Sequence, residues 1–177
     1  FKLQKNILLN ILKVGVPIAI QDGFIQVSFI IITIFANLRG LNDAAAVGIV
    51  EKLIGILFLV PSSLLSTVSA LSAQNIGAGK HKRAQQTLQY AIIIAIIFGT
   101  ISSILMQFIA EAAVGLFSHD ARVIVLGGQY IRGYIWDCIF AGIHFSFSGY
   151  FCAYSLSNIS FIHNFISIIF ARIPLAW

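Results

Sequence analysis

Five long apolar stretches, separated by short polar segments, follow one another along this chain. They cover about residues 11–38, 44–73, 88–116, 123–154 and 159–177. A helix needs about 20 mostly apolar residues to cross a bilayer, and the stretches meet that length. None of them shows the strict alternation of apolar and polar positions that a barrel strand requires. The pattern therefore predicts an all-α bundle of about five membrane-spanning helices.

The connecting segments are short, at residues 39–43, 75–86, 118–122 and 155–158. None is long enough to hold a soluble domain, so we expect residues 1–177 to form a single transmembrane domain. A catalytic domain in an aqueous loop is thereby excluded, and we expect that the protein is not an enzyme. Phe1 is not an initiator Met and the apolar stretch ends abruptly at Trp177, so we expect a piece of a longer protein.

The composition agrees with a membrane protein, because 59% of the residues are hydrophobic and 10% are charged. Soluble domains carry about 25% charged residues, so the polar surface needed to coat a water-soluble globule is missing. The net charge of +5 could indicate nucleic acid. The basic residues, however, lie at the ends of the apolar stretches and not along a polar face, so we expect the lipid bilayer as partner and no nucleic acid. Cys138 and Cys152 lie in apolar stretches and are expected to be buried free thiols.

The distribution of basic residues predicts the orientation in the membrane. One side holds Lys2, Lys5, Lys13, Lys80, Lys82 and Arg83, whereas the other holds Arg39 and Arg122. Cytoplasmic loops carry the excess of Lys and Arg. We therefore expect a multi-pass protein of the cell (cytoplasmic) membrane, with the N-terminus and the 75–86 loop in the cytoplasm. Pro17 and Pro61 lie within the first two stretches, where each removes a helical hydrogen bond and favours a bend.

Ionisable side chains inside the apolar stretches are the candidates for chemistry, since each costs about 2.5–3.5 kcal/mol at the centre of a membrane helix. Asp137 lies midway along the fourth stretch. At helical spacing it shares a polar face with Tyr130, Tyr134, Ala141, His144 and Ser148. A carboxylate beside phenol and imidazole groups can bind Na⁺ through oxygen atoms or take up a proton. The alternative is a structural ion pair of Asp137 with Arg132 or Arg172.

Other candidates surround this one. Asp22 and Gln26 lie one turn apart beside Pro17, where they could form the wall of a cavity or an interhelical hydrogen bond. Glu51 lies near the outer end of the second stretch. His144 and His163 could relay protons, but a hydrogen-bonded histidine in the bundle is the simpler interpretation. No histidine pair has metal-ligand spacing on one helix, so we expect no metal apart from a possible Na⁺ at Asp137, and no cofactor other than a coupling ion.

Several motifs resemble one transporter family. The segment Ser69–Ala84, which contains Gln-Asn-Ile-Gly-Ala-Gly-Lys, is similar to the loop signature of the multidrug and toxic compound extrusion (MATE) family. Lys13–Gln21 resembles the opening of the second six-helix lobe of that family. Val47–Leu53, followed by Pro61, resembles its next helix, and Arg172–Pro174 its penultimate helix. The resemblance covers essentially the whole chain.

The resemblance implies a twelve-helix transporter with two pseudo-symmetric lobes. Such proteins export organic, often cationic, drug-like compounds while Na⁺ or H⁺ moves inward. This chain would form most of the second lobe, and the N-terminal lobe and the final helix would belong to the rest of the same protein. Asp137 and Glu51 match the acidic cation-site residues best by position, and Asp22 is a further contributor.

The chain departs from the family at residues 153–158, where it lacks the Gly-x-Gly-x-Thr-like turn that members often show after this helix. Two alternatives to an exporter remain. A lipid-linked precursor flippase of related fold would need a larger basic cavity in the membrane. A truncated, non-transporting membrane remnant would lack the rest of the transporter on either side.

Overall fold

The computed structural model describes residues 5–167 of the chain, and this part is built from helices, with no strand among the described residues. The helices are α1 (Lys5–Arg39), α2 (Leu41–Leu57), α3 (Leu59–Gly77), α4 (His81–Gly115), α5 (Ala121–Tyr134), α6 (Asp137–Ala153) and α7 (Ser157–Ser167). The prediction of an all-α membrane helix bundle is confirmed. Arg172 and the end of the fifth apolar stretch lie outside the described residues, as does the side chain of His163.

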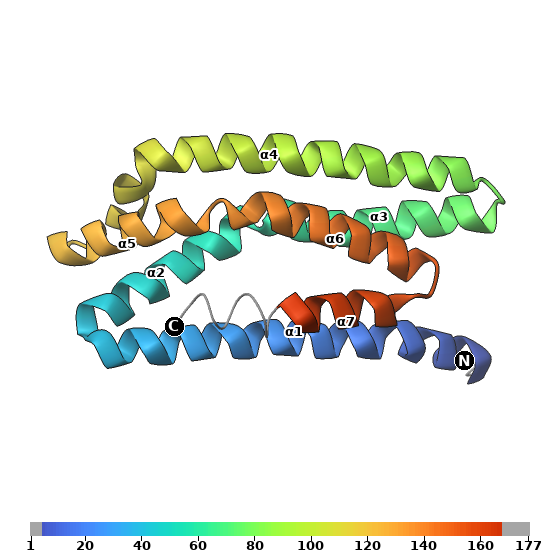
Figure 1. Cartoon of the computed structure of the whole chain (residues 1–177), viewed down its shortest axis with the longest axis horizontal. Helices are drawn as coiled ribbons and strands as arrows, with labels where there is room; N and C mark the ends of the chain where they lie inside the picture. Colours follow the sequence, from blue (N-terminus) through green and yellow to red (C-terminus); the bar gives the residue numbers. More distant parts are fainter. Residues whose placement is uncertain (1–4, 168–177) are drawn as a thin grey trace.

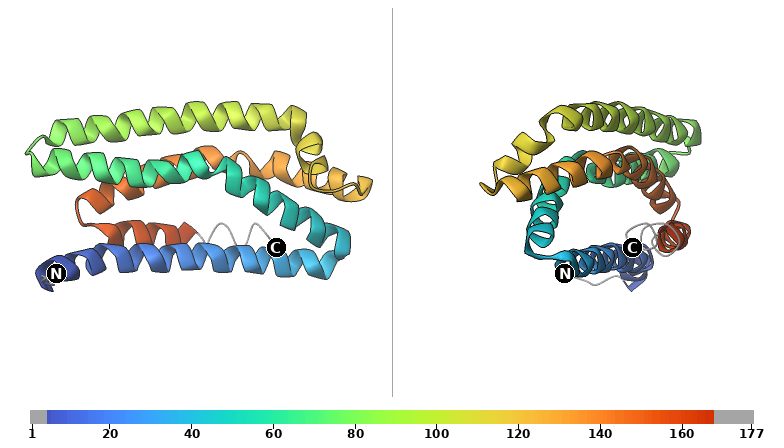
Figure 2. Two further views of the ribbon diagram at one scale, coloured as in Figure 1. Left: turned by 180° about the vertical axis from the view of Figure 1, so that it is seen from behind. Right: turned by 60° about the vertical axis from the view of Figure 1, so that its left-hand side comes forward.

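The helices lie side by side along one long axis, so their turns gather at two ends (Figure 1). The start of α1, the α3–α4 turn and the α6–α7 turn lie at one end. The α1–α2 and α4–α5 turns lie at the other (Figure 2). α3 packs against α4 and α6, α4 also packs against α5 and α6, and α1 packs against α2 and α7. Successive apolar stretches therefore run in alternate directions along the bundle (Figure 1 and Figure 2).

The second apolar stretch is bent where α2 ends and α3 begins, at Phe58 (Figure 1). Pro61 has no N–H group, so the carbonyl of Leu57, four residues earlier, loses its helical donor. The bonds on either side are kept, since Phe58 N–H donates to Ile54 and Ser62 N–H donates to Phe58. Pro61 therefore produces the expected bend. Pro17 does not interrupt α1, which runs on as a single helix of 35 residues.

The surface of this bundle differs from that of a soluble protein, because it is as apolar as the interior. Large apolar side chains point outward, as Phe108 (80% exposed) and Leu116 (82% exposed) show. Buried positions include many serines and Gln21. Without an opposing water phase, lipid-facing surfaces are apolar, and helix contacts rely on small and hydrogen-bonding residues. Cys138 and Cys152 are buried free thiols, as expected.

Within the described part of the chain, three helical segments are long and apolar enough to cross a membrane: Gly15–Arg39, Leu41–Gly77 and His81–Gly115. The fourth predicted stretch is divided into α5, with 14 residues, and α6, with 17 residues. α5, α4 and α2 enclose an apolar core around Val50, Val114 and Ile131, which are fully buried. This core includes Ile135 and Cys138, which lie on either side of the junction between α5 and α6.

Candidate functional site

The fourth apolar stretch is interrupted at Ile135 and Trp136, immediately before Asp137. The backbone hydrogen bonds span fewer residues at the interruption than in an α-helix. Cys138 N–H donates to the Ile135 carbonyl at 3.0 Å, and Ile139 N–H donates to the Trp136 carbonyl at 3.2 Å. Both bonds reach back three residues, as in a 3₁₀ turn. Asp137 is consequently the first residue of α6, where the positive end of the helix dipole favours a carboxylate.

A cavity of about 670 Å³ lies beside the interruption, between the end of α1, the start of α2 and α5. Among the described residues, its polar and aromatic lining consists of Phe35, Arg39, Asp43, Gln129, Tyr130, Tyr134 and Asp137. The other lining residues are apolar or glycine. A concave, largely apolar surface with a few polar groups is the usual form of a small-molecule site.

The charged groups in this lining favour a positive ligand. Asp43 and Asp137 supply two carboxylates and Arg39 supplies one guanidinium, so the described part of the lining, when ionised, has an excess of one negative charge. Two opposite charges 4 Å apart attract by about 4 kcal/mol at an effective dielectric constant near 20. Carboxylate and hydroxyl oxygens also suit a hard cation such as Na⁺.

Aromatic rings extend the same preference to organic cations. The rings of Tyr130 and Tyr134 lie 5.9 Å apart, and Phe58 lies 6.1 Å from Tyr134. Ring faces attract organic cations and offer them apolar contact area. The cavity therefore combines a carboxylate with an aromatic wall, the combination that a cationic, amphipathic compound requires.

The predicted site residues do not all meet at this cavity. Asp137 and Tyr134 line it together. Asp22 and Gln26 are exposed on α1 and precede its first lining residue, Ile32, by ten and six residues. At a rise of 1.5 Å per residue these separations are about 15 and 9 Å along the helix. His144 is half-buried on α6, about 10 Å along the helix from Asp137.

Glu51 lies close to the cavity without being part of its lining. Its Oε1 atom accepts a hydrogen bond of 2.9 Å from Thr33 Oγ1, which joins α2 to α1. Glu51 follows the lining residue Val47 by one helical turn. In this structure Glu51 connects the two helices that form one wall of the cavity.

The polar face predicted along the fourth stretch is not continuous. Tyr130 and Tyr134 precede the interruption and face the cavity, whereas Ser148 of α6 is buried and hydrogen-bonded to Ser160 of α7 at 2.6 Å. The physical reason is the turn at 135–136, which resets the helical phase between α5 and α6. Residues separated by multiples of a helical turn therefore do not share one face across it.

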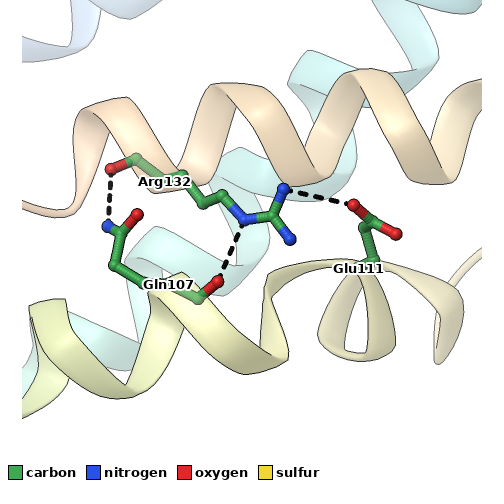
Figure 3. Close-up of polar contacts among 3 residues, drawn as sticks. All are labelled: Gln107, Glu111 and Arg132. Carbon is green, nitrogen blue, oxygen red and sulfur yellow. Dashed lines mark hydrogen bonds and ion pairs between the residues drawn. The ribbon is translucent and has the colours of Figure 1, made fainter.

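The alternative interpretation of Asp137 was an ion pair with Arg132, but Arg132 pairs with Glu111 instead. Arg132 Nη1 lies 3.1 Å from Glu111 Oε1, and Arg132 Nε donates to the Gln107 carbonyl at 3.1 Å (Figure 3). The pairing is possible because α5 and α4 lie against each other. Arg172, the other predicted partner, lies outside the described residues.

The sequence pattern did not predict one feature of the site or one buried contact outside it. Arg39 and Asp43 were assigned to a connecting segment, but the turn at Gly40 is so short that both line the cavity. Gln21 is buried and accepts a hydrogen bond of 3.2 Å from Ser160, which links α1 to α7. The sequence signal that could have identified Arg39 and Asp43 is their position at the ends of adjoining helices.

Comparison with known proteins provides an independent result. The family model described as MatE matches residues 17–177. The probable multidrug resistance protein YoeA of Bacillus subtilis is 27% identical over 141 residues, which cover 80% of this chain and 30% of that protein. The FAD transporter of Shewanella oneidensis is 31% identical over 137 residues, which cover 76% of this chain and 30% of that protein.

A third relative is the multidrug export protein MepA of Staphylococcus haemolyticus. It is 26% identical over 146 residues, which cover 82% of this chain and 32% of that protein. The chain thus spans about a third of the length of these curated relatives. No solved structure matches the chain significantly.

Proposed function

The chain belongs to the MatE family, and from that premise we propose that the complete protein exports organic cations across the cytoplasmic membrane in exchange for Na⁺ or H⁺. The observation that carries this proposal is the cavity in which Asp137 lies together with Tyr134 and Tyr130. Its excess negative charge and aromatic wall suit both a small coupling cation and a larger organic one. The names of the multidrug relatives support the export of drugs.

The mechanism rests on competition for the Asp137 carboxylate. A bound Na⁺ or proton neutralises the carboxylate and thereby favours one access state of the transporter. An arriving organic cation displaces that ion and favours the other state. Such a ligand shifts the conformational equilibrium only as far as its affinities for the two states differ, and the coupling is reciprocal.

The membrane orientation follows from the basic residues at one end of the bundle. Lys80, Lys82 and Arg83 are exposed there at the α3–α4 turn, whereas Arg39 of the cavity lies near the opposite end. With the basic end in the cytoplasm, the cavity lies in the outer half of the membrane. The N-terminal lobe and the final helix of the same protein would complete its enclosure.

The test uses everted membrane vesicles that contain the complete protein, with Na⁺ and pH gradients imposed separately. Uptake of a fluorescent organic cation is measured for the wild type, for Asp137→Asn and for Asp120→Asn. Asp120 is a matched control because it lies in an exposed turn and asparagine caps a helix as well as aspartate. We expect Asp137→Asn to abolish gradient-driven uptake and Asp120→Asn to retain it. Full gradient-driven uptake by Asp137→Asn would refute the coupling role.

A flavin dinucleotide is a second candidate substrate. It is favoured by the 31% identity to the relative named FAD transporter and by Arg39 in the cavity lining. A guanidinium can bind phosphate, and the tyrosine rings can contact the isoalloxazine ring. Adding flavin dinucleotide to the vesicle assay separates the two substrates. A flippase for lipid-linked precursors is less favoured, since Arg39 is the one basic side chain that residues 5–167 contribute to this lining.

A further inference from the structure

The interruption before Asp137 is held by side chains of α4. Gln107 Nε2 donates to the Arg132 carbonyl at 3.1 Å, and Ser103 Oγ donates to the Ile135 carbonyl at 3.2 Å. In return, Arg132 Nε donates to the Gln107 carbonyl at 3.1 Å (Figure 3). Three hydrogen bonds therefore join one segment of α4 to the last residues before Asp137.

The sequence spacing places the α4 partners in one row. Ser103, Gln107 and Glu111 follow one another at intervals of four residues, so they lie on the same face of α4. Glu111 extends the row by its ion pair with Arg132. Ser103 and Ile135 are fully buried, so water cannot replace their bond. The row faces the side of the fourth stretch that turns away from the cavity.

The bonds favour the interrupted form of this stretch over a straight helix. In a continuous helix the Arg132 carbonyl would accept from the N–H of residue 136, and it would need no side-chain donor. In hydrocarbon a carbonyl without a donor is costly, so the interruption requires partners. Gln107 supplies a donor to the Arg132 carbonyl. Ser103 adds a second donor at the Ile135 carbonyl, which also accepts from Cys138 N–H.

We propose that Ser103 and Gln107 are positioning residues for the cation site at Asp137. By holding the turn at 135–136, they set where the first residue of α6 enters the cavity beside Tyr134. This inference rests on the proposed function, since it assigns to α4 the geometry of the coupling site. Neither residue lines the cavity, so both act through the backbone and not through contact with the ion.

The test compares Ser103→Ala and Gln107→Leu with two controls in the complete transporter. Ser103→Thr keeps the hydroxyl donor, and Gln89→Leu makes the same exchange at an exposed position of α4 away from the turn. Two readouts are collected. One is the concentration of the coupling cation that gives half-maximal export in proteoliposomes. The other is the half-maximal concentration for cation-induced thermal stabilisation in detergent, which requires no transport.

Loss of one hydrogen bond is expected to raise both half-maximal cation concentrations about fivefold. The maximal export rate at saturating cation should stay within about twofold of the wild type, because a saturating ion restores occupancy. Ser103→Thr should restore the affinity, and Gln89→Leu should leave it unchanged. If Ser103→Ala does not fold, Ser103→Cys, which has nearly the same shape and a weaker donor, takes its place.

An unchanged half-maximal concentration in both α4 variants would overturn the inference. So would a fall in maximal rate without a change in cation affinity, since that result indicates general damage to the fold. Failure of the proposed function looks different. In that case the wild type itself shows neither cation-driven export nor stabilisation by Na⁺ or protons.

Discussion

The close approach between α6 and α3 leads to a quantitative prediction at Gly149. A Cβ atom placed there would meet the Leu65 carbonyl oxygen closer than real Cβ atoms come to any neighbour. It would also lie 3.2 Å from both the carbonyl carbon and the Cα atom of Leu65. All three atoms belong to the backbone, so no change of rotamer relieves the contact. The Gly149→Ala variant must therefore move the two helices apart.

The cost of that movement follows from known core substitutions. Overpacking by a methyl group costs about 1–3 kcal/mol, and the gain in helix propensity from Gly to Ala returns about 1 kcal/mol or less. We expect Gly149→Ala to lower the free energy of unfolding by about 1–2 kcal/mol. Gly55→Ala in α2 is the matched control, because a Cβ atom there meets nothing within 4 Å. It should leave stability unchanged or raise it by up to about 1 kcal/mol.

The assay is thermal unfolding of the complete protein in detergent, with the same chain ends and the same detergent for all variants. Each kcal/mol shifts the Tm of a domain of 150–250 residues by about 2–4 °C, and the shift is smaller for a larger cooperative unit. Gly149→Ala should therefore melt measurably below Gly55→Ala. Equal melting temperatures for the two variants would show that α3 and α6 do not approach each other through Gly149.

Three further predictions concern the turns at the two ends of the bundle. Asp120→Ala should lower the free energy of unfolding by about 1 kcal/mol, measured by thermal unfolding, and Asp120→Asn should hardly change it. The reason is that Asp120 Oδ1 accepts from the backbone N–H groups of Arg122 and Val123, in the first turn of α5, at 2.8 and 3.4 Å. Ser155→Gly should raise stability by about 0.5–1 kcal/mol, because Ser155 has a φ of 60°. Relief of a left-handed residue gains about 1–2 kcal/mol, and glycine's greater freedom in the unfolded chain offsets about 0.4–1 kcal/mol. In a background without native cysteines, Lys82→Cys should react with a membrane-impermeant thiol reagent in everted vesicles, and His119→Cys should react in intact cells. The reverse pattern would show that the protein has the opposite orientation in the membrane.

The local sequence pattern predicts the helices well and their interruptions unevenly. The bend at Phe58 could be predicted because Pro61 removes a hydrogen bond within its own helix. The interruption at 135–136 could not, because no proline causes it. Its partners, Ser103 and Gln107, come from another helix, about 30 residues earlier in the chain.

The candidate site shows the same limit. Helical periodicity drew attention to Asp137 and Tyr134, which do lie in one cavity. It also grouped His144 and Ser148 with them, because it assumes an unbroken helix. Arg39 and Asp43 could be placed in the cavity only once the α1–α2 turn was seen to bring their helix ends against α5.

The hydrogen bond between Gln21 and Ser160 has a consequence for biosynthesis. These residues are 139 positions apart, so the amide of Gln21 is made long before its partner. At about 5–20 residues per second, the ribosome needs about 7–28 s to synthesise the intervening chain. During that interval α1 must be accommodated by the insertion machinery with a polar amide on a surface that the finished bundle covers. Slowing translation between the two helices should therefore expose the nascent protein to membrane quality control for longer.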